Sequence, residues 1–271
     1  MYDFHTLLGA MPVGTLLSIA AILCLSGVVS GLSGFGFSAI GATCLFVLPP
    51  TQCVPLLFAL STANQLFSLC SLFGEMAKDR SSWETGPLPY ILGGLAGAPV
   101  GIWILTTLPT TALLLVFGGL LTAFSLYSLG RTQAAHSPAI AKPSGLLAPV
   151  LVGAIGGAVG GFTAFPSSPV VIWLGLTNTS KQQTRRVAQP FTLAMQLVSL
   201  GILLCTRPDL FDAKFWTLFV LMVPLVLMGT GTGVRIYRKI SDFNFRRVVF
   251  LLLATSGFGL IAKNLGFALI A

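Results

Sequence analysis

Long apolar segments constrain this chain more than any other feature. An α-helix needs roughly 20 predominantly apolar residues to cross the hydrocarbon core of a bilayer. Segments of that kind lie at 13–31, 53–74, 87–106, 109–130, 145–162, 187–206, 214–234 and 245–264. Only 8% of the 271 residues are charged, whereas soluble domains carry charge on about a quarter of theirs. The chain has too few charges to cover a water-facing globule, so we expect it to lie in a membrane.

These segments are predicted to be helices. A membrane β-barrel is the other structure that satisfies its own backbone in lipid, and its strands alternate apolar and polar residues. The segment 113–121 is apolar on every side. Two further apolar pieces, 37–48 and 166–176, follow glycine-rich breaks and are shorter than a usual span, so half-helices or re-entrant segments are favoured and the sequence leaves open whether they fully cross. We expect each to form a re-entrant hairpin with the preceding helix, which gives an all-α polytopic membrane protein with interrupted, glycine-rich hairpins.

The two halves of the chain resemble each other. Three blocks recur in the same order, and such self-similarity indicates an internal repeat. The matches are Gly31 and Gly34 with Gly157 and Gly160, 65–69 with 196–200, and 97–101 with 229–233. We therefore divide the single membrane domain into a first repeat at 1–131, a linker at 132–144 and a second repeat at 145–271.

The loop charges predict how the chain crosses the membrane. Of the 15 Lys and Arg residues, twelve fall in the segments 75–85, 131–144, 177–186 and 235–247. Cytoplasmic loops carry such an excess. We therefore expect a cell inner membrane protein with both termini outside, and no nucleic-acid partner behind the net charge of +8. Each half then crosses an odd number of times, so the repeats are inverted, as is typical of alternating-access transporters with interrupted helices.

The two predicted hairpin tips are the candidate binding site. A half-helix that begins at mid-membrane points free N–H groups and the positive end of its dipole into the site, which favours an anion. The candidate substrate-binding residues at the tips are Ser33, Gly34, Gly36, Ser38, Gly160, Gly161, Thr163, Ser167 and Ser168. Close helix packing is the alternative role for the glycines, and the sequence leaves both roles open.

Polar side chains in the long helices extend this candidate site. Asn64 and Gln65 lie in mid-span, and we predict that they line the pathway, with interhelical hydrogen bonding as the alternative. For Gln189 and Gln196 the interhelical role is favoured. Arg185, near the start of a helix, is expected at the cytoplasmic mouth, where it either collects an anion or only marks the topology.

The ionisable residues disfavour several functions. Asp and Glu occur in loops and at helix ends, which argues against a cation site or a carboxylate proton relay. Residues 31–34 have the GxSG form of an intramembrane serine protease, but a nucleophilic serine needs a nearby base. The two histidines, His5 and His136, fall in the N-terminal tail and the central loop, and the five cysteines form no metal-binding pattern. We expect neither an enzyme nor a bound cofactor or metal.

With these motifs the chain resembles the sulfite exporter TauE/SafE family. The resemblance rests on the run from Ser30 to Gly36, on the apolar run 169–174, and on Lys181 followed four residues later by Arg185. It extends from about residue 14 to residue 263. Many members have proline where this chain has Ser168, and glycine is more usual across 163–167, so the resemblance leaves open which anion is carried.

The resemblance implies an inner-membrane carrier that exports sulfite or an organosulfonate such as sulfoacetate. The expected mechanism is alternating access, and an anion channel with the same inverted frame is the alternative. The expected partners are a small anionic substrate and the lipid bilayer, and the sequence is compatible with a homo-oligomer.

Overall fold

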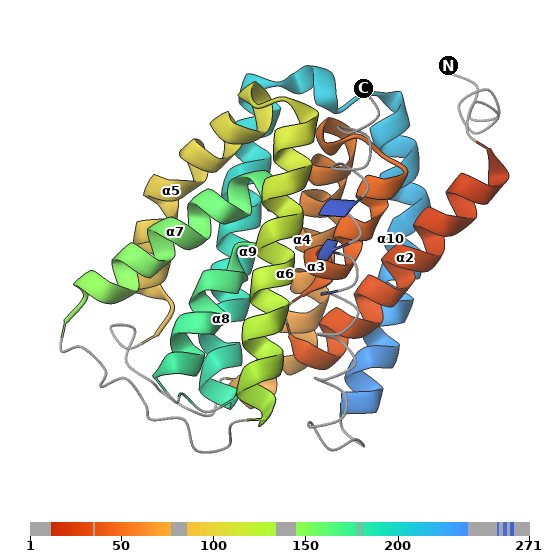
Figure 1. The fold of residues 1–271 in the computed structure, drawn as a ribbon. Coiled ribbons are helices and arrows are strands. Elements are labelled where there is room, and N and C mark those ends of the chain that lie inside the picture. The colour runs from red at the N-terminus through yellow and green to blue at the C-terminus, as the bar shows by residue number, and fades with distance from the viewer. Residues whose placement is uncertain are drawn as a thin grey trace.

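All regular structure in the described ranges is helical. A computed structural model describes residues 12–34, 36–76, 86–133, 145–177, 179, 181–237, 254, 257, 258, 261 and 262. Six helices in these ranges are long and apolar enough to cross a membrane, and they form the bundle in Figure 1. They are α2 (Val13–Ser33), α4 (Pro50–Met76), α5 (Leu88–Thr107), α6 (Thr110–Gln133), α9 (Lys181–Thr206) and α10 (Ala213–Tyr237). The six confirm the predicted spans at their positions, and the chain is a multi-pass, all-α membrane protein.

Two other predicted spans have a different outcome. α7 (Leu147–Thr163) forms where a span is expected, but its 17 residues place it at the lower limit for crossing a bilayer. It ends where Ala164 adopts a left-handed conformation with a φ of 56°. The predicted span at 245–264 lies almost wholly outside the described residues, as do most of the linker, Phe35, His5 and His136.

The first glycine-rich break interrupts the chain as predicted. The second break lies later than predicted, because α7 continues through Gly160 and Gly161 and ends at Thr163. α2 ends where Gly34 adopts a φ of 80°, and Gly36 follows at 97°. Glycine takes such angles at little cost because it has no Cβ.

The short segments after the breaks differ from each other. In the second hairpin, α8 (Ser167–Leu176) is one continuous helix of ten residues. In the first, α3 (Phe37–Gly41) has five residues and passes into the 3-10 helix η1 (Ala42–Phe46). A helix dipole is the sum of aligned peptide dipoles, so the expected half-helix dipole is largely missing from the first hairpin. A second 3-10 turn, η2 (Pro208–Leu210), connects α9 to α10.

Glycines bring two pairs of helices into backbone contact, α2 with α10 and α5 with α7. A methyl group built on Gly31 of α2 would meet the Thr230 carbonyl oxygen and lie 3.1 Å from the Gly233 Cα of α10. One built on Gly161 of α7 would lie 2.7 Å from the Gly101 Cα of α5. Such approaches leave little or no room for a side chain, so helix packing, one of the two roles left open by the sequence, is the role of Gly31 and Gly161.

The same contacts recur in register in the two pairs. Gly31 contacts Gly233 as Gly161 contacts Gly101, with equivalent residues 130 and 132 positions apart. The sequence match of Gly31 with Gly157 is therefore wrong by about one helical turn. Glycines recur every four residues in α7, so the sequence fits two registers equally well, and the contacts between helices separate them.

α4 and α9 form the centre of the bundle between these pairs. They pack on each other, and α4 also packs on α10 while α9 packs on α5. Exchange of the two halves of the chain converts the α2–α10 pair into α7–α5 and the α4–α10 pair into α9–α5. This is the contact pattern that an internal structural repeat produces.

Alanine substitutions at two neighbouring glycines of α10 test this packing. Gly229→Ala should destabilise the protein, because its methyl group would overlap the Cys24 carbonyl of α2, and overpacking costs about 1–3 kcal/mol. Gly231→Ala meets nothing within 4 Å and should be neutral or slightly stabilising, since alanine favours a helix. Thermal unfolding of both variants in detergent provides the comparison, and equal shifts would contradict the α2–α10 contact.

Candidate functional site

Polar side chains from α4 and α9 surround the first tip, where α2 ends at Gly34. A Cβ built on Gly34 would lie 2.6 Å from Arg185 Nε and 3.0 Å from Gln189 Nε2. Arg185 donates from Nη2 to the Gly31 carbonyl, and Gln65 donates from Nε2 to the Gly34 carbonyl, each at 3.5 Å. The backbone of the first tip therefore meets one guanidinium and two carboxamides.

Arg185 lies closer to the first tip than the sequence indicates. We expect it at the cytoplasmic mouth, apart from the tips, but its Cγ would be 2.9 Å from a Cβ on Gly34. The expected separation is wrong. Glycine at this position leaves room for the arginine side chain to pass directly over the backbone, and a local sequence pattern does not reveal a contact between residues so far apart in the chain.

Gln189 and Gln65 bring unsatisfied amide groups to this tip. Gln189 is fully buried, and neither its Oε1 nor its Nε2 has a hydrogen-bond partner among the described residues. Gln65 is 1% exposed, and its Oε1 likewise has none there. A buried polar group without a partner costs about 1–3 kcal/mol and calls for a functional or structural explanation. The two amides can offer both donors and acceptors to a small polar ligand.

Asn64, which we predict to line the pathway, makes hydrogen bonds to two other helices. Its Nδ2 donates to Ser30 Oγ at 2.7 Å, and its Oδ1 accepts a hydrogen bond from Thr230 Oγ1. These bonds join α2, α4 and α10. Asn64 therefore makes the interhelical bonds that the sequence leaves open as its alternative role, whereas Gln189, for which such bonds are favoured, makes none among the described residues.

Gln196 of α9 also makes an interhelical bond. Its Nε2 donates to Ser61 Oγ of α4. This bond agrees with the favoured interpretation of Gln196, although its Oε1 has no partner among the described residues.

The other residues predicted at the first tip contribute unequally. Gly36 supplies the turn that precedes α3. Ser38 is 1% exposed, and its Oγ has no hydrogen-bond partner in the described part of the chain. Ser33 is the last residue of α2, and its side chain lies outside what the structure describes. Ser38 is therefore the hydroxyl of this tip that is available to a ligand in the described ranges.

At the second tip, where α7 ends at Ala164, two of the predicted hydroxyl groups hydrogen-bond to nearby backbone atoms. Thr163 Oγ1 donates to the Val159 carbonyl at 2.7 Å and accepts the Phe165 N–H at 3.1 Å. Ser168 Oγ donates to the Phe165 carbonyl at 3.2 Å. These hydroxyls stabilise the turn and are already engaged.

The remaining predicted residues of the second tip have mixed roles. Ser167 is fully buried, and its Oγ has no partner within the described ranges. A methyl group on Gly160 would lie 2.8 Å from the Pro166 Cα, so Gly160 lets the hairpin close on itself. Gly161 faces α5, as described above.

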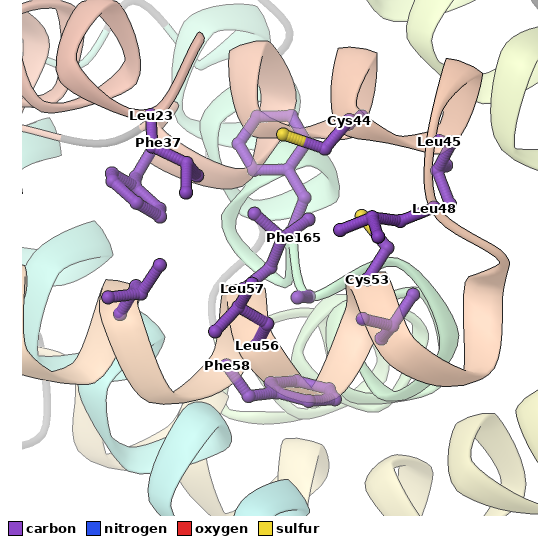
Figure 2. Packing of buried hydrophobic residues seen from close by; sticks show 14 of the residues in the cluster. Leu23, Phe37, Cys44, Leu45, Leu48, Cys53, Leu56, Leu57, Phe58 and Phe165 are labelled. Atoms are coloured by element: carbon purple, nitrogen blue, oxygen red, sulfur yellow. The ribbon is translucent and has the colours of Figure 1, made fainter. Parts of the chain in front are cut away.

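Phe165 makes the second tip apolar. Its ring is 4% exposed and packs edge-on against Phe124, with the ring centroids 5.4 Å apart. Figure 2 shows Phe165 among Cys44 of η1 and Cys53 and Leu57 of α4, all members of one buried hydrophobic cluster.

The α4 positions equivalent to Arg185 and Gln189 reinforce this difference. By the register that matches Gln65 with Gln196, they are Val54 and Phe58. Both are fully buried and apolar. One half of the chain therefore brings a cation and an amide to a tip, and the other half brings hydrocarbon.

The described side chains do not form a metal centre, since no three His, Cys, Asp or Glu residues among them gather in one place.

The sequence model of a protein family described as sulfite exporter TauE/SafE matches residues 19–260. The chain belongs to this family. TauE/SafE proteins are membrane transporters of sulfite and related sulfur compounds rather than enzymes, so the resemblance drawn from the sequence is confirmed. No curated protein matches the chain.

Leucine substitutions at two buried amides of this TauE/SafE protein distinguish a residue that binds the anion from one that stabilises the fold. Gln189→Leu should raise the unfolding temperature, because it removes an amide that lacks partners, yet it should weaken anion binding. Asn64→Leu should lower the unfolding temperature by breaking two interhelical bonds, at a cost of about 1–3 kcal/mol. Thermal unfolding with and without sulfite measures both effects. A Gln189→Leu variant that is destabilised, and whose unfolding temperature still rises fully on addition of sulfite, would contradict the placement of Gln189 in the anion site.

Proposed function

We propose that this protein exports a small sulfur oxyanion, either sulfite or an organosulfonate, across the cytoplasmic membrane by alternating access. The observation that carries the proposal is the position of the Arg185 guanidinium beside Gly34 and the buried Gln189 amide. Membership of the sulfite exporter family supports the same substrate class.

The chemistry of the first tip suits an oxyanion. A guanidinium is planar and always charged, and its N–H groups match the spacing of two oxygens on one central atom. The Gln189 amide and the Ser38 hydroxyl add neutral donors, both buried and without partners among the described residues. The described side chains of α2, α3, α4 and α8 include no Asp or Glu.

The helix contacts support movement of two rigid units. The α2–α10 and α5–α7 pairs are each held by backbone contact at glycines, which makes deformation within a pair costly. α4 and α9, which carry the polar side chains, lie between them. Rocking of one pair against the other would expose the first tip alternately to the two sides, as in transporters built from inverted repeats.

The part of the buried hydrophobic cluster formed by Phe165 and Cys53 serves as the seal on the outer side. Cys53 lies in the first turn of α4, whereas Arg185 lies near the start of α9. The start of α4 is close to the start of α10, since Lys214 Nζ donates to Gln52 Oε1 at 3.0 Å. α9 ends at Thr206, only a short connection before α10, so the start of α4, which carries Cys53, and the start of α9, which carries Arg185, lie at opposite ends of the bundle (Figure 1).

Counterflow in proteoliposomes tests the function. Labelled sulfite should enter liposomes faster when unlabelled sulfite is present inside, because a carrier returns loaded more readily than empty. Arg185→Gln should lose most of this flux, whereas Gly231→Ala, which adds a methyl group in open space, should keep it. Flux without trans-stimulation would indicate an anion channel, and no sulfite flux in the unmodified protein would contradict the proposal.

A further inference from the structure

A hollow of about 240 Å³ lies on the side of the bundle between α4, α9 and α10. We propose that it binds one acyl chain of a phospholipid whose phosphate group lies beside Lys214. The lipid belongs to the leaflet at the end of the bundle where η2 connects α9 to α10. The residues assigned to the first tip do not line this hollow, so the inference is independent of the transported anion.

The lining of the hollow is almost wholly hydrocarbon. Its apolar members include Ala59 and Leu66 of α4, Leu204 of α9, and Phe215 and Trp216 of α10. Thr62 is the one polar residue of the lining, and its hydroxyl donates to the Phe58 carbonyl of its own helix at 2.7 Å. An apolar cavity of about 150 Å³ is already large enough to hold benzene. The hollow therefore suits a hydrocarbon ligand.

The hollow opens onto the lipid-facing surface of the bundle. Leu204, Leu66 and Trp216 are 45%, 48% and 51% exposed. On α4 the lining runs from Ala59 to Leu66, which is about 10 Å along the helix axis. An unfilled hollow would leave its lining atoms without dispersion partners. The hydrocarbon in contact with this surface is that of the bilayer, so an acyl chain is the ligand that can enter.

Lys214 provides a partner for the phosphate at the η2 end of the hollow. Its Nζ donates to Gln52 Oε1 at 3.0 Å. Gln52 precedes Ala59 by seven residues, which places the two on one face of α4 and about 10 Å apart. The ammonium group of Lys214 thus lies in line with the hollow. Because the Gln52 amide is neutral, the charge of Lys214 is left for a phosphate group, which lysine binds as a point charge.

The other charges at this end have partners. Arg207 donates from Nε and Nη2 to the two carboxylate oxygens of Asp209, at 2.9 and 2.7 Å. Asp212 accepts the Phe215 N–H at 2.8 Å, and its carboxylate can still attract the ammonium group of a zwitterionic lipid. Among the described residues at the η2 end, Lys214 is therefore the cation that has no carboxylate partner.

The described part of the C-terminal segment lies against a different helix. A Cβ built on Gly257 would be 2.6 Å from Thr122 Oγ1 of α6. α6 contributes no residue to the lining of the hollow. That part of the chain therefore does not fill the hollow.

Trp216 can report whether a lipid occupies the hollow. Two single-tryptophan proteins are compared, one with Trp216 and one with Trp103, which is 63% exposed on α5, a helix that does not line the hollow. Each is reconstituted with phosphatidylethanolamine that carries brominated acyl chains, which quench tryptophan on contact, and is then extracted and washed in detergent. Both should be quenched in the bilayer. After extraction Trp216 should keep most of its quenching while Trp103 recovers, because a lipid held in the hollow is retained.

Ala63→Phe and Ala96→Phe form a matched pair of variants in the Trp216 protein. Ala63 lines the hollow, so the ring that replaces it should take the space of the acyl chain and abolish the retained quenching. Ala96 is exposed on α5, so the same ring there should leave the quenching unchanged. If Ala63→Phe does not fold, Lys214→Gln replaces it, and the brominated lipid should then wash out several-fold faster.

The outcomes distinguish a bound lipid from the surrounding bilayer and from protein. Recovery of Trp216 to the same extent as Trp103 would show annular lipid only and would overturn the inference, as would retained quenching in Ala63→Phe. A Trp216 that is not quenched in the bilayer would mean that another segment of the chain or a second copy covers the hollow, which would also overturn it. Failure of sulfite export in liposomes would leave the lipid site standing.

Discussion

Backbone contact at glycines is the constraint on which the rest of this structure depends. In lipid there is little hydrophobic force to drive helices together, so close packing of small residues becomes the main source of association. Gly31 against Gly233 and Gly161 against Gly101 bring two helix pairs to a separation that admits no side chain. Because α2 and α7 are fixed in this way, the points where they end are fixed as well, and the two tips take defined positions beside α4 and α9.

The helix contacts repeat between the two halves of the chain, but the side chains at the two tips differ. Equivalent helices make equivalent contacts, yet one tip meets Arg185 and Gln189 while the other places Phe165 against an apolar cluster. Two identical polar tips would leave a continuous polar path through the bundle. In the proposed transport cycle, the polar tip would bind the anion and the apolar tip would close the other side, which is the arrangement that a carrier requires at any one moment of its cycle.

Much of this fold follows from the sequence because it depends on local properties. The length of an apolar segment sets a span, and glycines with a left-handed conformation, such as Gly34, end a helix wherever they occur. The register between the halves does not follow, since glycines spaced by four residues fit two alignments. The roles of Asn64 and Gln189 do not follow either, because each depends on which side chains other helices bring near. Sequence reasoning finds the polar residues of the bundle, and tertiary contacts decide which of them hold it together.

The position of a bound anion tests the central claim most directly. Selenite, a close analogue of sulfite with a strong anomalous signal, can be located in crystals of the protein by its selenium. The account predicts one peak at the first tip, within hydrogen-bond distance of Arg185 and Gln189 and beside Gly34. A peak beside Ala164 and Phe165, with none at Arg185, would contradict it.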